Sequence, residues 1–234
     1  MKLYGSATSP YVRKARVLIE EKGLPVEFVI EDPWAENTPV ALKNPLGKVP
    51  VLEIADNDFI FESVLIVHFL DHVDGRSLTP RDPVGYWEAQ RWQALGNGMI
   101  DAAIQRVFET RRPAAFQMPE KMQREEARIQ RAVKLAETNC KGNEFLVGTR
   151  FSLADIMMGV ALQYIDFRYS HDWRSQAPKL AAWHAGVTSR ASFTKTLPPD
   201  FTPPQTAAVA PVVAALALAS VEPATVAPQE EPSA

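Results

Sequence analysis

The sequence predicts a small α/β domain followed by an all-helical domain. Strand-like and helix-like segments alternate from Lys2 to about Val73. Residues 75–83, which contain Pro80 and Pro83, then mark a change of composition that is typical of a linker. After this linker the apolar residues recur only at spacings of three and four, as in helices. An α/β unit, a linker and a helical bundle therefore make up the predicted architecture.

The N-terminal part is predicted to run strand, helix, strand, irregular segment, strand, strand and helix. Residues 2–5 form the first strand, and the helix after them has clear signals at both ends. Ser9 suits the N-cap, Pro10 the first helical position and Gly23 the C-cap. Residues 26–30 are the next strand, and residues 51–54 and 59–61 form an antiparallel hairpin.

The later part is predicted to be helical throughout. One helix carries Trp92 and Met99 on its buried face and stops before Pro113, and another begins at Pro119. A buried helix then runs to about Tyr169, and a last helix carries the apolar residues Leu180, Trp183 and Val187. Residues 203–234 are rich in Ala and Pro and contain no aromatic residue, so we expect a disordered tail there.

Composition excludes several classes of function. The chain carries 25 Lys and Arg against 28 Asp and Glu, and this near balance argues against nucleic acid as a partner. Cys140 is the only cysteine, so no intramolecular disulfide or thiolate metal cluster forms, which fits a reducing, cytoplasmic compartment. No apolar run approaches the roughly 18 residues that a membrane span needs. We also find no signal peptide and expect no metal.

Residues 44–52 and the pair Glu62-Ser63 predict a binding corner for an amino-acid-like ligand. Pro50 at the start of a strand leaves backbone groups near Val49 without ladder partners. Ser63 is predicted to cap the next helix, whose N–H groups and dipole suit a carboxylate, while Glu62 suits an ammonium. An ordinary hairpin before a well-capped helix explains each residue singly. Their combination favours a ligand.

Four motifs, in this order, resemble those of the cytosolic glutathione S-transferases: Ser9-Pro10-Tyr11 with Arg13, the segment NPLGKVPVL at 44–52, Glu62-Ser63, and the capping box Ser152-Leu153-Ala154-Asp155. The resemblance covers about Met1 to Pro199. It implies a thioredoxin-like, glutathione-binding domain over residues 1–75, with a cis peptide before Pro50, and an all-helical domain over residues 84–199. The Ser-Pro-aromatic opening is similar to the serine-type classes, including plant tau and phi enzymes and small bacterial relatives.

The resemblance also implies roles for particular residues. Ser9 would be catalytic and would donate a hydrogen bond to the sulfur of glutathione, the co-substrate. Glutathione would be held by Lys48, Val49, Glu62 and Ser63. A small hydrophobic electrophile would bind between the domains, against Tyr11, Met99, Ala103 and Arg106. The family further implies a homodimer that takes part in detoxification.

The chemistry expected at Ser9 depends on its position at a helix start. A free thiol has a pKa near 8.5, and a helix N-terminus lowers it, so a thiol docked there is largely thiolate at neutral pH. A plain N-cap describes the same serine without a ligand. The competing hypothesis is a non-catalytic scaffold of this fold that binds protein partners, and affinity for glutathione distinguishes the two.

Overall fold

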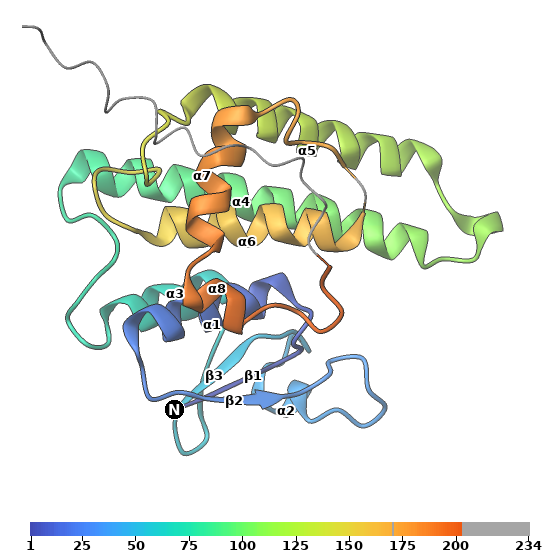
Figure 1. Ribbon diagram of the computed structural model, residues 1–234. Helices are drawn as coiled ribbons and strands as arrows, with labels where there is room; N and C mark the ends of the chain where they lie inside the picture. The colour runs from blue at the N-terminus through green and yellow to red at the C-terminus, as the bar shows by residue number, and fades with distance from the viewer. Residues whose placement is uncertain (170, 203–234) are drawn as a thin grey trace, which may run out of the picture. The chain divides into compact units, whose positions relative to one another are not determined.

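The computed structural model describes residues 1–169 and 171–202, which belong to one compact unit. It confirms the predicted fold class, an α/β part followed by helices (Figure 1). The tail predicted over residues 203–234 lies outside the described residues. The domain boundaries expected at 75 and 84 stay a prediction.

The N-terminal part is built on a four-stranded sheet in the order β2-β1-β3-β4. Strand β1 pairs in parallel with β2 and antiparallel with β3, and β3 and β4 form the predicted antiparallel hairpin. Asn57, with φ of 58°, lies in the turn of this hairpin, where a left-handed backbone is common. The strands are β1 (Lys2–Gly5), β2 (Glu27–Ile30), β3 (Val51–Ala55) and β4 (Asp58–Phe61).

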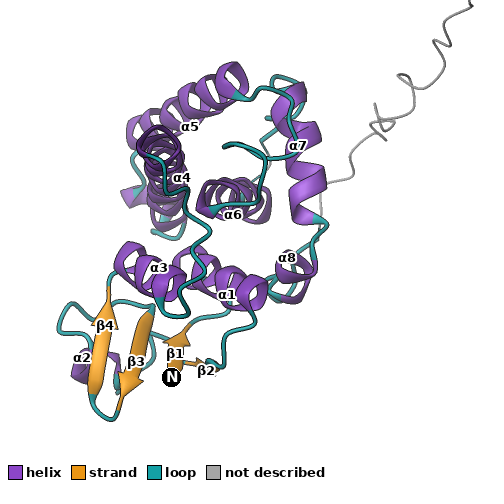
Figure 2. Cartoon of the chain, turned by 90° about the vertical axis from the view of Figure 1, so that its left-hand side faces the viewer, coloured by secondary structure: helices purple, strands orange, loops and turns teal. Residues whose placement is uncertain are grey.

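Helices α1 (Pro10–Lys22) and α3 (Ser63–His72) lie between the sheet and the later helices (Figures 1 and 2). Gly23 ends α1 with φ of 61°, as predicted for a C-cap glycine. A short helix, α2 (Val40–Lys43), occupies part of the segment predicted to be irregular. Its four residues are too few to show a helical period.

The second part is helical, and none of its helices is both long and apolar enough to cross a membrane within the described residues. Helix α6 is central: it packs against α1, α4 and α7, and residues 153–165 are all buried. Gly96 allows the close approach of α4, because a Cβ there would lie 2.5 Å from Cγ of Met157. The elements are α4 (Pro83–Thr110), the 3-10 helix η1 (Ala114–Phe116), α5 (Pro119–Asn139), α6 (Leu153–Arg168), α7 (Pro178–Thr188) and α8 (Ala191–Lys195).

The predicted capping box at the start of α6 is present. The carboxylate of Asp155 is buried and accepts hydrogen bonds from Ser152 N and Oγ, both at 2.9 Å. It also accepts from Leu146 N at 2.9 Å and Trp183 Nε1 at 3.0 Å. Burial raises the pKa of Asp155, while these four bonds favour its charged form. Asp155 thus joins α6, α7 and the preceding loop.

Buried polar side chains fasten α1 to the C-terminal end of the described chain. The guanidinium of Arg13 is 3% exposed and donates to Gln163 Oε1 at 2.5 Å and to the carbonyl of Phe193 at 3.2 Å. Burial lowers the pKa of Arg13 to about 9. Arg190 binds Glu21 through two hydrogen bonds of 2.8 Å. Helices α1, α6 and α8 therefore stabilise one another.

The linker before α4 is held by one carboxylate. Asp71, fully buried in α3, accepts hydrogen bonds from Ser77 Oγ at 2.6 Å and Leu78 N at 2.7 Å. It also accepts from the hydroxyl of Thr79 at 2.8 Å. The connection between the two parts of the chain is thus ordered by α3.

Candidate functional site

The strand register brings three of the predicted site segments to one edge of the sheet. Val51 pairs with Tyr4 on one side and with Phe61 on the other. Just beyond these three paired residues lie the loop that leads to Ser9, the peptide Val49-Pro50 and the pair Glu62-Ser63. Sequence-distant segments therefore meet because β1, β3 and β4 are neighbours.

Ser9 is the N-cap of α1, as predicted. Its backbone is extended, with φ of −77° and ψ of 124°, and its Oγ accepts a hydrogen bond from Val12 N at 3.4 Å. Because Oγ is the acceptor in that bond, the hydroxyl proton is free for another partner. Among the described residues, no histidine or carboxylate binds this hydroxyl. Ser9 is thus placed to donate a hydrogen bond and not to act as a base.

The peptide bond between Val49 and Pro50 is cis, which confirms the expectation. Within the described part of the chain, neither the N–H nor the carbonyl of Val49 has a backbone hydrogen-bond partner. The loop before it is braced by Asn44, 1% exposed, which accepts from Leu46 N at 3.0 Å and donates to the carbonyl of Lys48 at 2.8 Å. The side chain of Lys48 is exposed. Backbone groups at Val49 are therefore available to a ligand.

The expected N-cap at Ser63 is wrong, because the structure places Glu62 in that position. Glu62 Oε2 accepts a hydrogen bond from Val64 N at 2.9 Å, and Ser63 is the first residue of α3. The Ser63 hydroxyl donates to Glu62 Oε1 at 3.3 Å. The backbone of Glu62 has φ of 73°, which is rare for a residue with a side chain. This conformation turns an exposed carboxylate back over the helix start.

Tyr11 faces α4 and binds an acidic group there. Its hydroxyl donates to Oδ1 of Asp101, and burial, followed by this bond, raises the pKa of Tyr11. Lys14, one turn further along α1, is fully buried and donates to Asn97 Oδ1 at 3.0 Å. Burial lowers the pKa of Lys14 to about 8, although the charges of Glu62 and Asp101 oppose this shift. The sequence offered no signal for Lys14 or Asp101.

Three residues expected at the electrophile site face elsewhere. Met99 and Ala103 are 1% and 0% exposed, so their side chains are part of the helical core. Helical spacing predicts a face of α4 but does not distinguish a packed face from one that lines a cleft. Arg106 bonds the carbonyl of Met122 and Glu126 Oε2, each at 3.1 Å. Of the four residues expected to contact the electrophile, only Tyr11 is close to Ser9 in the sequence.

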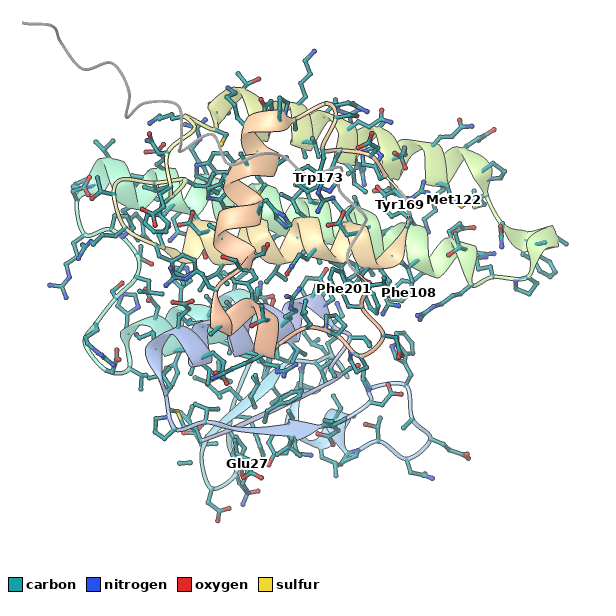
Figure 3. All side chains as sticks on the ribbon, in the orientation of Figure 1. Glu27, Phe108, Met122, Tyr169, Trp173 and Phe201 are labelled. Atoms are coloured by element: carbon teal, nitrogen blue, oxygen red, sulfur yellow. The ribbon has the colours of Figure 1, made fainter. Side chains whose placement is uncertain are left out.

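Aromatic residues gather at the C-terminal ends of α4 and α6 instead. The ring of Trp34, from the loop after β2, lies 5.8 Å from the ring of Phe108 in α4. Phe167 of α6 lies 6.1 Å from Phe201. In the view of Figure 3, Phe108 and Phe201 lie on the side of α4 and α6 that faces the sheet, whereas Tyr169 lies on the side of α5. The sequence analysis did not identify this group, because its members come from separate elements.

Comparisons with known proteins identify the family of the chain. Family models described as glutathione S-transferase, N-terminal domain and C-terminal domain match residues 3–77 and 119–186. The Escherichia coli protein named Uncharacterized GST-like protein YibF is 35% identical over 201 residues, covering 85% of this chain and 99% of that protein.

Two solved structures of glutathione S-transferases are also similar. The one from Methylobacillus flagellatus, with glutathione bound, is 38% identical, has a TM-score of 0.81, and the match covers 84% of this chain and 98% of that one. The one from Methylobacterium radiotolerans, in complex with glutathione sulfonate, is 33% identical with a TM-score of 0.80, covering 89% and 99%. This chain therefore belongs to the glutathione S-transferase family.

Proposed function

We propose that this protein is a glutathione transferase that joins the sulfur of glutathione to a small hydrophobic electrophile. The observation that carries the proposal is the convergence at one sheet edge of the Ser9 hydroxyl, the unpaired backbone of Val49 and the Glu62-Ser63 helix start. A helix N-terminus, a free backbone edge and a carboxylate suit a thiol-containing peptide with an ammonium and a carboxylate. The glutathione bound in the Methylobacillus relative supports the same ligand.

In the proposed reaction, Ser9 stabilises the thiolate of glutathione. The positive end of α1 lowers the pKa of the bound thiol, whose proton passes to solvent, and the Ser9 hydroxyl donates a hydrogen bond to the sulfur. The sulfur then attacks an electrophilic carbon, and the C–S bond forms as the leaving group departs with its electron pair. Ser9 is the catalytic residue because its hydroxyl contacts the reacting atom.

The remaining site residues hold the peptide. The Glu62 carboxylate binds the γ-glutamyl ammonium, and Ser63 binds the neighbouring carboxylate at the start of α3. The Val49 backbone pairs with the cysteinyl unit, and Lys48 lies near the tripeptide. Tyr11, two residues after Ser9, contacts the second substrate.

We also propose that the protein works as a cytoplasmic homodimer. Exposed apolar side chains on α3 and at the start of α4 support a partner surface: Leu65 is 56% exposed, Val84 78% and Trp87 66%. Large apolar side chains left in water favour burial against a second surface. The partner we expect is a second copy of this chain.

Isothermal titration with glutathione tests the proposal, followed by turnover of a panel of halides, isothiocyanates, enones and peroxides. We expect saturable binding of glutathione and turnover of at least one electrophile. Binding without any turnover would contradict catalysis, and the absence of binding would favour the non-catalytic scaffold.

A further inference from the structure

A cationic and aromatic cluster lies at the C-terminal end of α6. The guanidinium carbon of Arg168 lies 4.1 Å from the centre of the Phe167 ring and 5.6 Å from the centre of the Tyr164 ring. Phe167 is in turn 6.1 Å from Phe201. A guanidinium over an aromatic ring can still donate hydrogen bonds from the N–H groups along its edge.

Among the described residues no carboxylate pairs with the charge of Arg168, whose side chain has a hydrogen bond to the hydroxyl of Tyr164. Its Nε is buried without a hydrogen bond, and across residues 1–169 and 171–202 no carboxylate oxygen lies within 4.0 Å of its nitrogens. Two arginines near it in the chain are paired: Arg174 lies 2.7 Å from Asp166 and Arg190 lies 2.8 Å from Glu21. Arg168 is only partly buried, so its guanidinium can still be reached, and a guanidinium among aromatic rings without a carboxylate beside it is suited to an anionic ligand.

The cluster lies on the side of α6 that adjoins α1 and the site. Helix α6 packs against α1, and Tyr164 is close enough to Tyr11 to influence its ionisation. Burial raises the pKa of Tyr164, while the charge of Arg168, its hydrogen bond to the phenol oxygen and the charge of Arg111 oppose that shift. Arg168, 5.6 Å from the centre of the Tyr164 ring, is therefore linked through Tyr164 to Tyr11, which lies two residues after Ser9.

Asp101 is the acidic group that faces Tyr11 from α4, and it does not neutralise this cluster. Its carboxylate accepts the hydrogen bond of the Tyr11 hydroxyl, and the charge of the buried Lys14 acts on it. The negative charge of Asp101 is thus already balanced by groups on α1, and the positive charge of Arg168 remains available to a ligand.

We propose that Arg168 binds a carboxylate on the second substrate, so that the preferred electrophile has a planar apolar body and an anionic group. The planar fork of a guanidinium fits a carboxylate through two parallel hydrogen bonds, and the rings of Phe167 and Tyr164 suit the apolar body. The inference rests on the proposed function. It names the class of substrate, and the reacting bond is the C–S bond already described.

Binding of two product analogues to the full-length protein tests the inference. The probes are S-(4-carboxybenzyl)glutathione and S-benzylglutathione, which differ only in the carboxylate, and titration calorimetry measures both. Because a hydrogen bond to a charged group is lost, the Kd of Arg168→Gln for the carboxybenzyl probe should rise by about tenfold or more. The same variant should bind S-benzylglutathione within about twofold of the wild type, since no charge is lost to that probe.

Matched variants separate the outcomes. Arg131→Gln removes the same charge from an exposed position of α5 and should leave both affinities unchanged, and Arg168→Lys should keep part of the preference. If Arg168→Gln weakened the binding of both probes equally, or changed the binding of neither, the inference would be overturned. The proposed binding of glutathione would not be affected by either result. Failure of the wild type to bind either probe would overturn the proposed function, and the inference with it. Wild-type affinity of Arg168→Gln for S-benzylglutathione also shows that the variant is folded.

Discussion

The carboxylate of Glu62 has two tasks that substitutions can separate. It caps α3 through its 2.9 Å bond from Val64 N, and in the proposed function it binds the ammonium of glutathione. Glu62→Ala removes both the cap and the charge. Glu62→Gln keeps an oxygen that can accept the bond from Val64 N but loses the charge. The wild-type backbone at this position has φ of 73°, and none of the three residues compared is glycine, so the strain of this conformation does not distinguish them.

The expected magnitudes follow from these contacts. Loss of a helix N-cap costs about 0.5–2 kcal/mol of stability, so we expect that loss in Glu62→Ala and a smaller one in Glu62→Gln. A hydrogen bond to a charged group contributes about 1.5–3 kcal/mol, so both variants should bind glutathione about 10- to 100-fold more weakly. Urea denaturation measures the first quantity and titration calorimetry the second. Wild-type affinity in Glu62→Gln would refute the assignment of the ammonium to this carboxylate.

Four further results are expected. Ser9→Ala should lower turnover of a model electrophile with glutathione affinity nearly unchanged; equal losses of turnover and affinity would make Ser9 a positioning residue. Between pH 8 and 10 the Lys14 side chain is protonated in the unfolded protein but largely deprotonated in the folded protein, where burial lowers its pKa to about 8. The unfolding free energy of the wild type should therefore rise relative to Lys14→Met by about 1.4 kcal/mol per pH unit, and parallel curves in urea denaturation would contradict this. Asp155→Ala should cost about 3 kcal/mol or more, because Leu146 N and Trp183 Nε1 lose their acceptor, whereas the exposed Asp172→Ala should change little in the same assay. Trp87→Glu should shift the protein toward monomer in analytical ultracentrifugation, and an unchanged mass would exclude this surface as the dimer contact.

Short-range signals in the sequence predicted most of the fold. Ser9, Pro10 and Gly23 define the ends of α1 because capping depends only on neighbours in the chain. The capping box at Ser152 and Asp155 was found for the same reason. Helices of four or five residues, such as α2 and α8, were missed because they are shorter than one amphipathic repeat.

The sequence predicted those parts of the candidate site that depend only on residues close together in the chain. Side-chain type favoured Ser63 as a cap, but the backbone turn at Glu62 brings the longer carboxylate onto the Val64 N–H. Met99 recurs at helical spacing whether its face is packed or open, so the spacing did not show that its side chain is buried. The position of Arg168 depends on how α6 crosses α1, and no spacing in the sequence encodes that crossing.

The bonds from α1 to the last described helices have a consequence for the order of events during synthesis. Arg13 depends on Gln163 and on the carbonyl of Phe193, and Glu21 on Arg190. When the sheet and α1 have left the ribosome, these partners have not yet been made. The α/β half then has buried charged groups without partners, which disfavours its independent folding. We therefore expect the nascent chain to become protease-resistant in one step, only after α8 has emerged.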